Sequence, residues 1–359
     1  MSGETDQYRD PSGRIEPDGG KPAIDISELT FSYPDGTEAV SNISLRIPQG
    51  EFFGFLGPNG AGKTTVIKTI VTLLRPTGGR VEVFGRDVEA TPQSVRERIG
   101  YMAQETSIDA ELTARENIEF AAETHHLPRD EHATRIDELL DLVGLADVAD
   151  KRAGTFSGGM KKRLDAATAL VHDPPLVFLD EPTTGLDPRA RNRLWEYFHE
   201  ISERGATVFL TTQYLEEADE LADRIGVIAD GEMIASGTPT ELKAAVGGDV
   251  LDIVLEAQTD AARERARTQV ADADLLGDGE TVAVTNEGLR VTSTRASELS
   301  PDVLAALRDG GVGIASLNLR SPTLDDVFLA LTGEGLDAES PEGEQSAAPA
   351  IDHAAPEVE

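Results

Sequence analysis

Short apolar runs alternate with longer amphipathic segments through the first 240 residues. The short runs are typical of buried strands and lie at 24–29, 40–47, 51–56, 176–179, 207–211, 225–229 and 232–237. Apolar residues that recur every three or four positions predict helices at 64–74, 114–125, 129–143, 158–171, 189–204 and 216–223. Strands that alternate with helices indicate an α/β fold in which a largely parallel, mixed sheet is covered on both faces. The fold also includes a helical subdomain.

The pattern stops near residues 243–248 and then begins again. Strands are predicted at 250–255, 282–284, 289–292 and 313–319, and helices at 258–270, 296–308 and 324–331. This β-α-β-β-α-β order with one added helix predicts a small α+β accessory domain. We therefore expect two domains, 23–245 and 246–333, and disordered acidic tails at 1–22 and 334–359.

The charge balance is strongly acidic, with 66 Asp and Glu against 32 Lys and Arg and a net charge of −34. The two predicted tails hold 13 acids and 3 bases, so the remaining 53 acids and 29 bases still give −24. A nucleic-acid partner is disfavoured because binding a phosphate backbone needs clustered cations. The charge favours a halophilic protein whose self-repulsion is screened by salt, and the alternative is a merely acidic soluble protein.

The composition also limits where the chain works. It has no cysteine, which excludes disulfides and thiolate metal sites. Its N-terminal residues are polar and acidic, unlike a secretory signal. No apolar run reaches the roughly 18 residues that cross a bilayer. We expect a cytoplasmic protein that reaches the inner face of the membrane only through a partner, without direct insertion.

A glycine-rich loop carries the clearest chemistry. It follows a predicted strand, opens a predicted helix and fits G-x-x-x-x-G-K-[ST]. Its glycines let backbone N–H groups surround phosphate oxygens, while the lysine reaches the β- and γ-phosphates and the first threonine completes a Mg²⁺ shell. The expected ATP-binding residues are Gly57, Pro58, Asn59, Gly60, Ala61, Gly62, Lys63, Thr64 and Thr65.

Two carboxylates follow the buried run 176–179. Asp180 is positioned to orient Mg²⁺, and Glu181 to activate the attacking water as a general base. Together with the loop, this pair predicts ATP hydrolysis, with Lys63 and Glu181 as catalytic residues.

These motifs resemble the ATP-binding cassette (ABC) proteins. Ser157, Gly158 and Gly159 match that family's signature loop, which implies a head-to-tail homodimer in which each signature closes over the nucleotide of the opposite subunit. Gln104 matches the family's catalytic and metal-sensing glutamine, which also contacts a separate integral membrane permease. Further nucleotide contacts are implied for two residues, Asp187 at the dimer seam and Tyr33 against adenine; Tyr33 is equally interpretable as a packing residue before a turn.

One position departs from the common pattern. Most members have a switch histidine after the last core strand, whereas this chain has Gln213. Glutamine can donate a hydrogen bond to a γ-phosphate but carries no charge at neutral pH. We therefore keep Gln213 as a catalytic candidate and expect Glu181 to carry more of the reaction. Gln213, the Ser-Gly-Gly-Met variant of the signature and the segment 322–329 together resemble the daunorubicin-resistance (DrrA-like) group.

The resemblance implies the ATP-hydrolysing subunit of an ABC-2-type exporter of drugs, antibiotics or other hydrophobic compounds. The alternative is a soluble ABC ATPase acting on ribosomes or DNA. A single cassette, and only 100 residues between Gly57 and Ser157, argue against that alternative because no long coiled-coil insertion fits. An importer ATPase is a third possibility, which neither Gln213 nor the accessory domain supports.

A small basic cluster follows the signature. Lys161, Lys162 and Arg163 stand together in an otherwise acidic protein. Their position at the start of a helix favours local ion pairs over a nucleic-acid patch.

Overall fold

The computed structural model describes residues 20–332, apart from 246–247, 274 and 278–279. The tails that we expected to be disordered, 1–22 and 334–359, lie outside the described residues except for 20–22. Between these limits the elements follow the predicted order closely.

The central sheet has six strands in the order β10-β9-β3-β8-β7-β6. All neighbours are parallel except β9 and β10, which form an antiparallel hairpin at one edge. The α/β class and the mixed sheet are therefore confirmed. The strands are β3 (Phe52–Leu56), β6 (Ile99–Met102), β7 (Leu176–Asp180), β8 (Thr207–Thr212), β9 (Arg224–Ala229) and β10 (Glu232–Gly237).

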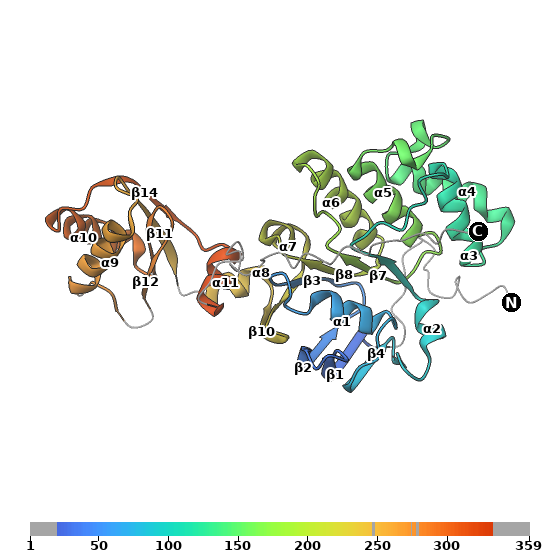
Figure 1. Cartoon of the computed structure of the whole chain (residues 1–359), viewed down its shortest axis with the longest axis horizontal. Helices are drawn as coiled ribbons and strands as arrows, with labels where there is room; N and C mark the ends of the chain where they lie inside the picture. Colours follow the sequence, from blue (N-terminus) through green and yellow to red (C-terminus); the bar gives the residue numbers. More distant parts are fainter. Residues whose placement is uncertain (1–19, 246–247, 274, 278–279, 333–359) are drawn as a thin grey trace, which may run out of the picture.

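Both faces of this sheet are buried, and β3 shows how its sequence achieves this. Successive side chains point to opposite faces, so Phe53 and Phe55 enter one apolar cluster while Phe52 and Leu56 enter the other. The first cluster contains α1 (Lys63–Ile70), and the second contains a layer of helices (Figure 1). These helices are α3 (Ala114–Thr124), α4 (Arg129–Leu142), α5 (Gly158–Ala169) and α6 (Pro188–Glu203).

The first two predicted strands do not join the central sheet. They form a separate antiparallel sheet in the order β2-β1-β4-β5, which packs on the other side of α1. Several elements were not predicted because they are short or lack a clear apolar period. They are β4 (Gly78–Val83), β5 (Arg86–Asp87), α2 (Pro92–Arg96), β6 and α8 (Pro239–Ala245), while β1 (Ile24–Ser32) and β2 (Glu38–Ile47) extend the predicted runs.

The accessory region forms its own antiparallel sheet in the order β12-β13-β11-β14. Two helices pack on it, and an apolar cluster that includes Ile253, Val291 and Val303 fills the space between them. The predicted β-α-β-β-α-β order is present in the structure. The elements are β11 (Asp249–Leu255), α9 (Asp260–Asp272), β12 (Thr281–Val284), β13 (Gly288–Ser293), α10 (Ala296–Asp309) and β14 (Ile314–Arg320).

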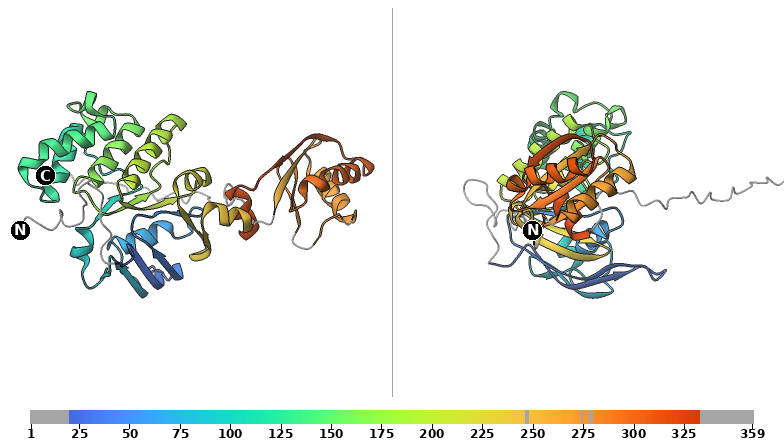
Figure 2. Two further views of the ribbon diagram at one scale, coloured as in Figure 1. Left: turned by 180° about the vertical axis from the view of Figure 1, so that it is seen from behind. Right: turned by 90° about the vertical axis from the view of Figure 1, so that its left-hand side faces the viewer.

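The last described helix, α11 (Leu324–Thr332), belongs to both parts of the molecule. Its Leu324, Val327 and Phe328 lie in the apolar cluster of the first domain, against α8 and α7 (Leu215–Leu221) (Figures 1 and 2). On the same helix Asp326 pairs with Arg320 of the accessory sheet at 2.6 Å. The predicted boundary between residues 245 and 246 assigns α11 to the accessory domain, although this helix packs in the core of the first domain. The boundary itself remains a prediction.

Among the described residues, no helix has the length and apolar character needed to cross a bilayer.

Candidate nucleotide-binding site

The loop between β3 and α1 has a backbone path that only glycine can follow at its tightest points. Gly62 has a φ of +102° and precedes Lys63, the first residue of α1. A Cβ atom at Gly62 would lie 2.4 Å from the carbonyl oxygen of Ala39, and one at Gly57 would lie 2.3 Å from that of Ile228. The loop is thus pressed against β2 and β9, with the N–H groups of the first α1 turn facing it.

Lys63 is buried at the base of this loop, with 4% of its surface exposed. Its Nζ donates hydrogen bonds to the carbonyl oxygens of Gly57 at 2.8 Å and Pro58 at 3.0 Å. The same ammonium lies 3.1 Å from Oε1 of Glu181. One cation therefore joins the loop to the acidic end of β7, where a phosphate chain would bring further negative charge.

Asp180 is fully buried at the end of β7. Its Oδ1 accepts hydrogen bonds from the hydroxyls of Thr211 at 2.6 Å and Thr64 at 3.2 Å. Its Oδ2 is buried without a partner, and burial raises the pKa of this carboxyl above its ordinary value. A free carboxylate oxygen beside a threonine hydroxyl fits a hard divalent cation such as Mg²⁺. Among the described residues, no group of three or more His, Cys, Asp or Glu is arranged to hold a metal ion, so such an ion would also need phosphate oxygens and water.

Glu181 is held from three sides. Its Oε1 meets Lys63, its Oε2 accepts a hydrogen bond from the side-chain amide of Gln104 at 3.0 Å, and its backbone N–H donates to Thr211. Its φ of +47° is unusual for a residue with a side chain, and strain of this kind persists only where the surroundings enforce it. The carboxylate is buried and fixed in direction, as a general base requires.

Tyr33 lies beside the same loop. Its hydroxyl is 3.1 Å from Oγ1 of Thr65, and its ring meets that of Phe31 edge to face at 5.0 Å. The Tyr33 side chain is still 39% exposed. Both readings of this residue find support, because it packs against Phe31 and also keeps a free surface beside the loop.

Gln213 follows the end of β8 at the same edge of the sheet. Thr211 pairs with Asp180 across β7 and β8, so Gln213 stands two residues beyond the level of Asp180. Glu217, four residues later on α7, was not predicted as part of this region. It is fully buried, and its Oε1 accepts hydrogen bonds from Thr183 at 2.9 Å and Trp195 at 3.0 Å. Burial raises the pKa of Glu217. In the sequence, only its position four residues after Gln213 indicated that Glu217 belongs to this region.

The signature residues stand apart from this cluster. Ser157 caps the N-terminus of α5 by accepting a hydrogen bond from the N–H of Met160, and Gly158 and Gly159 form the first turn. Within the described part of the chain, Ser157 makes no hydrogen bond to the phosphate loop. Asp187 likewise caps α6 by accepting hydrogen bonds from the N–H groups of Arg189 and Ala190, and its side chain is exposed. One subunit alone therefore leaves both motifs facing outward.

Among the described residues, the basic cluster after the signature forms no ion pairs, contrary to the prediction. Lys162 donates a hydrogen bond to the carbonyl oxygen of Gln104, and Arg163 donates to the carbonyl oxygen of Val143 at 2.6 Å. These cations fasten α5 to neighbouring backbone because the adjacent loops offer carbonyl groups at that face.

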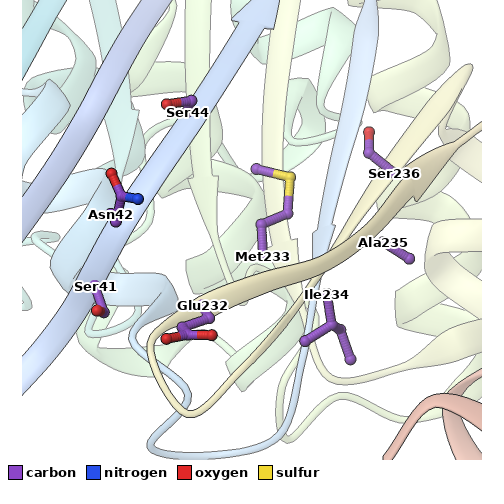
Figure 3. A pocket seen from close by; sticks show the side chains of 8 residues that line it. All are labelled: Ser41, Asn42, Ser44, Glu232, Met233, Ile234, Ala235 and Ser236. Atoms are coloured by element: carbon purple, nitrogen blue, oxygen red, sulfur yellow. The ribbon is translucent and has the colours of Figure 1, made fainter.

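A cavity of about 420 Å³ lies elsewhere, between the edge strands β2 and β10 (Figure 3). It is open and mostly polar, and no expected site residue lines it. Its lining residues are Ser41, Asn42, Ser44, Glu232, Met233, Ile234, Ala235 and Ser236. The candidate site is therefore defined by the convergence of Lys63, Asp180 and Glu181 and not by this cavity.

Comparison with known proteins identifies the family to which the chain belongs. The family model described as "ABC transporter" matches residues 40–184, and the model described as "ATP-binding protein DrrA1-3-like, C-terminal domain" matches residues 237–332. A dimeric ATP-binding cassette solved in a post-hydrolysis state with ADP and Pi is 28% identical, with a TM-score of 0.56 over 60% of this chain and 98% of that chain. The chain belongs to the ABC transporter family of ATP-binding proteins, and its enzymatic activity is ATP hydrolysis.

Its curated relatives define the group more closely. The daunorubicin resistance ATP-binding protein DrrA3 of Streptomyces coeruleorubidus is 46% identical over 87% of this chain and 96% of that protein. The daunorubicin/doxorubicin resistance ATP-binding protein DrrA of Streptomyces peucetius is 43% identical over 89% of this chain and 95% of that protein. Within the ABC family, the chain is a member of the DrrA-like group.

Proposed function

We propose that this chain powers an exporter by hydrolysing ATP at the site formed by the phosphate loop, Asp180 and Glu181. The placement of Glu181 between Lys63 and Gln104 is the observation that carries this proposal. Lys63 and the loop N–H groups hold the β- and γ-phosphates. Mg²⁺, which neutralises charge on the phosphate oxygens when bound, would be held by Thr64, Asp180 and Gln104.

Glu181 acts as the general base in this proposal. Its carboxylate accepts a proton from the attacking water, and Gln104 fixes the direction of the carboxylate through the 3.0 Å hydrogen bond. Gln213 donates a neutral hydrogen bond toward the γ-phosphate without carrying a proton. Tyr33 stacks on the adenine with its exposed face.

The proposed working unit is a head-to-tail homodimer. In the single chain, Ser157, Gly158 and Asp187 are exposed. A second copy, turned head to tail, would bring these groups to the first copy's nucleotide. The dimeric state of the solved cassette with ADP and Pi supports this arrangement.

The proposed partner is a separate membrane permease that carries drugs, antibiotics or other hydrophobic compounds outward. The names of the relatives, which concern resistance to daunorubicin and doxorubicin, support export as the direction. The chain would then work at the cytoplasmic face of the membrane, attached through the permease. The match to transporter subunits does not favour a role on ribosomes or DNA.

The Glu181→Gln variant tests the mechanism. The amide keeps the size of the side chain but cannot accept the water proton, so we expect kcat to fall by about 10²- to 10⁴-fold while ATP binding is retained. Glu203→Gln, an exposed acid at the end of α6, is the matched control with unchanged turnover. ATPase assays and ATP titration give both quantities, and undiminished turnover in Glu181→Gln would refute the role of the carboxylate.

The same pair of variants tests transport. The chain is co-expressed with a candidate ABC-2 permease, and ATP-dependent daunorubicin uptake is measured in inside-out vesicles. We expect uptake with the unchanged protein and with Glu203→Gln, but not with Glu181→Gln. ATPase activity without uptake, together with recovery of the chain on ribosomes, would favour the rival function.

A further inference from the structure

The loop at residues 103–109, which carries Gln104, is fastened to α5 by two side chains. The Nζ of Lys162 donates a hydrogen bond to the carbonyl oxygen of Gln104. The Oδ1 of Asp165 accepts hydrogen bonds from the hydroxyl of Ser107 at 2.6 Å and from its backbone N–H at 3.2 Å. Lys162 and Asp165 are three residues apart, so they stand on one face of the helix.

The same loop also holds the expected general base. While the carbonyl of Gln104 accepts from Lys162, its side-chain amide donates to Oε2 of Glu181 at 3.0 Å. One residue thus links α5 to the carboxylate. A shift of Lys162 relative to β7 would change the position of Gln104 and, through it, the direction in which Glu181 points.

The other end of this connection is the signature. Ser157 caps α5, and Lys162 follows five residues later, about 7.5 Å along the helix axis. A helix is stiff over this distance, so movement at the signature also moves Lys162.

Lys162 is half-buried beside acidic groups. The carboxylates of Asp165, Asp180 and Glu181 attract its ammonium, which favours the contact with the loop carbonyl. Lys162 thus places a positive charge next to the carboxylates of the site, where Gln213 is neutral.

We propose that Lys162 is a positioning residue that couples the signature helix to Glu181 through Gln104, so that each catalytic carboxylate responds to the nucleotide held by the partner subunit. This inference rests on the proposed head-to-tail dimer. It gives the two nucleotide sites a physical connection that passes through one lysine.

Kinetics of matched variants test the coupling. Lys162→Met removes the donor and keeps the chain length, whereas Lys161→Met removes a neighbouring charge that makes no hydrogen bond or ion pair among the described residues. We expect Lys162→Met to lower kcat by about 10- to 100-fold with KM for ATP unchanged, because a small misplacement of catalytic groups has effects of this size. Lys162→Arg should restore most of the turnover, and Lys161→Met should resemble the unchanged protein.

Amide hydrogen exchange gives a second readout that activity alone does not. In the unchanged protein, ATP should slow exchange both in residues 57–65 and in residues 103–109. In Lys162→Met only the slowing at 57–65 should persist. Equal kcat values for the two methionine variants, or a loss of turnover that arginine does not restore, would overturn the inference. An unchanged protein without ATPase activity would instead refute the proposed function.

Discussion

Gly62 illustrates how much a single methyl group would change in the phosphate loop. Its Cβ would lie 2.4 Å from the carbonyl oxygen of Ala39, and its φ of +102° is itself unfavourable for alanine. Gly36 also has a positive φ, +91°, but nothing lies within 4 Å of its would-be Cβ. The two glycines therefore separate the cost of the clash from the cost of the backbone conformation.

We expect Gly62→Ala to abolish ATP binding and to lower the free energy of unfolding by more than Gly36→Ala does. The conformational cost alone is about 1–3 kcal/mol, and it applies at both positions. Gly36→Ala should keep ATP binding intact. Urea unfolding and ATP titration measure these effects, and equal losses in both variants would show that the Ala39 contact is unimportant.

At this scale, local patterns in the sequence nominate residues but do not reveal their contacts. Lys63, Asp180 and Glu181 were identified because each stands in a local pattern that determines its chemistry. The bond between Gln104 and Glu181 joins residues 77 positions apart, and no local pattern contains that information. The contacts of Lys162 and Glu217 were not predicted either, because their burial and their distant partners are properties of the folded chain.

Among the elements, length decided which ones could be predicted. Long amphipathic helices such as α6 were found nearly to the residue, because their apolar period repeats several times. The strand β5 has two residues and α2 has five, so neither completes a recognisable period. The separate β2-β1-β4-β5 sheet was not predicted, because the sequence of one strand does not reveal which distant strand it pairs with.

The junction formed by α11 leads to a prediction about one carboxylate. Asp326 is buried, and it pairs with Arg320 at 2.6 Å and Arg290 at 2.9 Å. The adjacent Asp325 is about half-exposed, and the one ion pair that it makes among the described residues is with Arg290 at 3.3 Å. Asp326→Asn removes one of two carboxylates that these arginines share, while Asp252 stays 2.7 Å from each of them. We therefore expect the variant to lose about 1–3 kcal/mol of stability, against about 0–1 kcal/mol for Asp325→Asn. Thermal unfolding of both variants measures the difference, and similar losses would contradict it.

The pH dependence of this junction follows from the same contacts. Hydrogen bonds from Arg320 and Thr323, with the arginine charges, outweigh burial and lower the pKa of Asp326. A carboxyl with a lowered folded-state pKa stabilises the fold fully above its unfolded-state pKa, near 4, and loses that contribution as the pH falls through the folded-state value. The Asp326→Asn variant should therefore lose less stability than the unchanged protein on acidification below about pH 4.

For the whole molecule, the net charge of −34 predicts an unusual response to salt. Repulsion among surface acids is screened over about 10 Å at 0.1 M salt but over about 3 Å at 1 M. If the charge reflects halophilic adaptation, the unfolding temperature should rise between 0.1 M and about 2 M KCl. Sucrose is the uncharged control, and full stability at low salt with no gain from KCl would contradict halophilic adaptation.

The packing of α11 on α8 also determines how the accessory domain can move. The chain leaves the nucleotide-binding core at α8 and returns to it at α11, and these two helices lie against each other. A domain joined by one linker can rotate in any direction, whereas one joined at two neighbouring points turns most easily about the line between them. The accessory sheet is therefore joined to the core at two neighbouring points, α8 and α11, and we expect it to rotate about the line between them. The helix α7, which follows Gln213, packs against α11 at this junction.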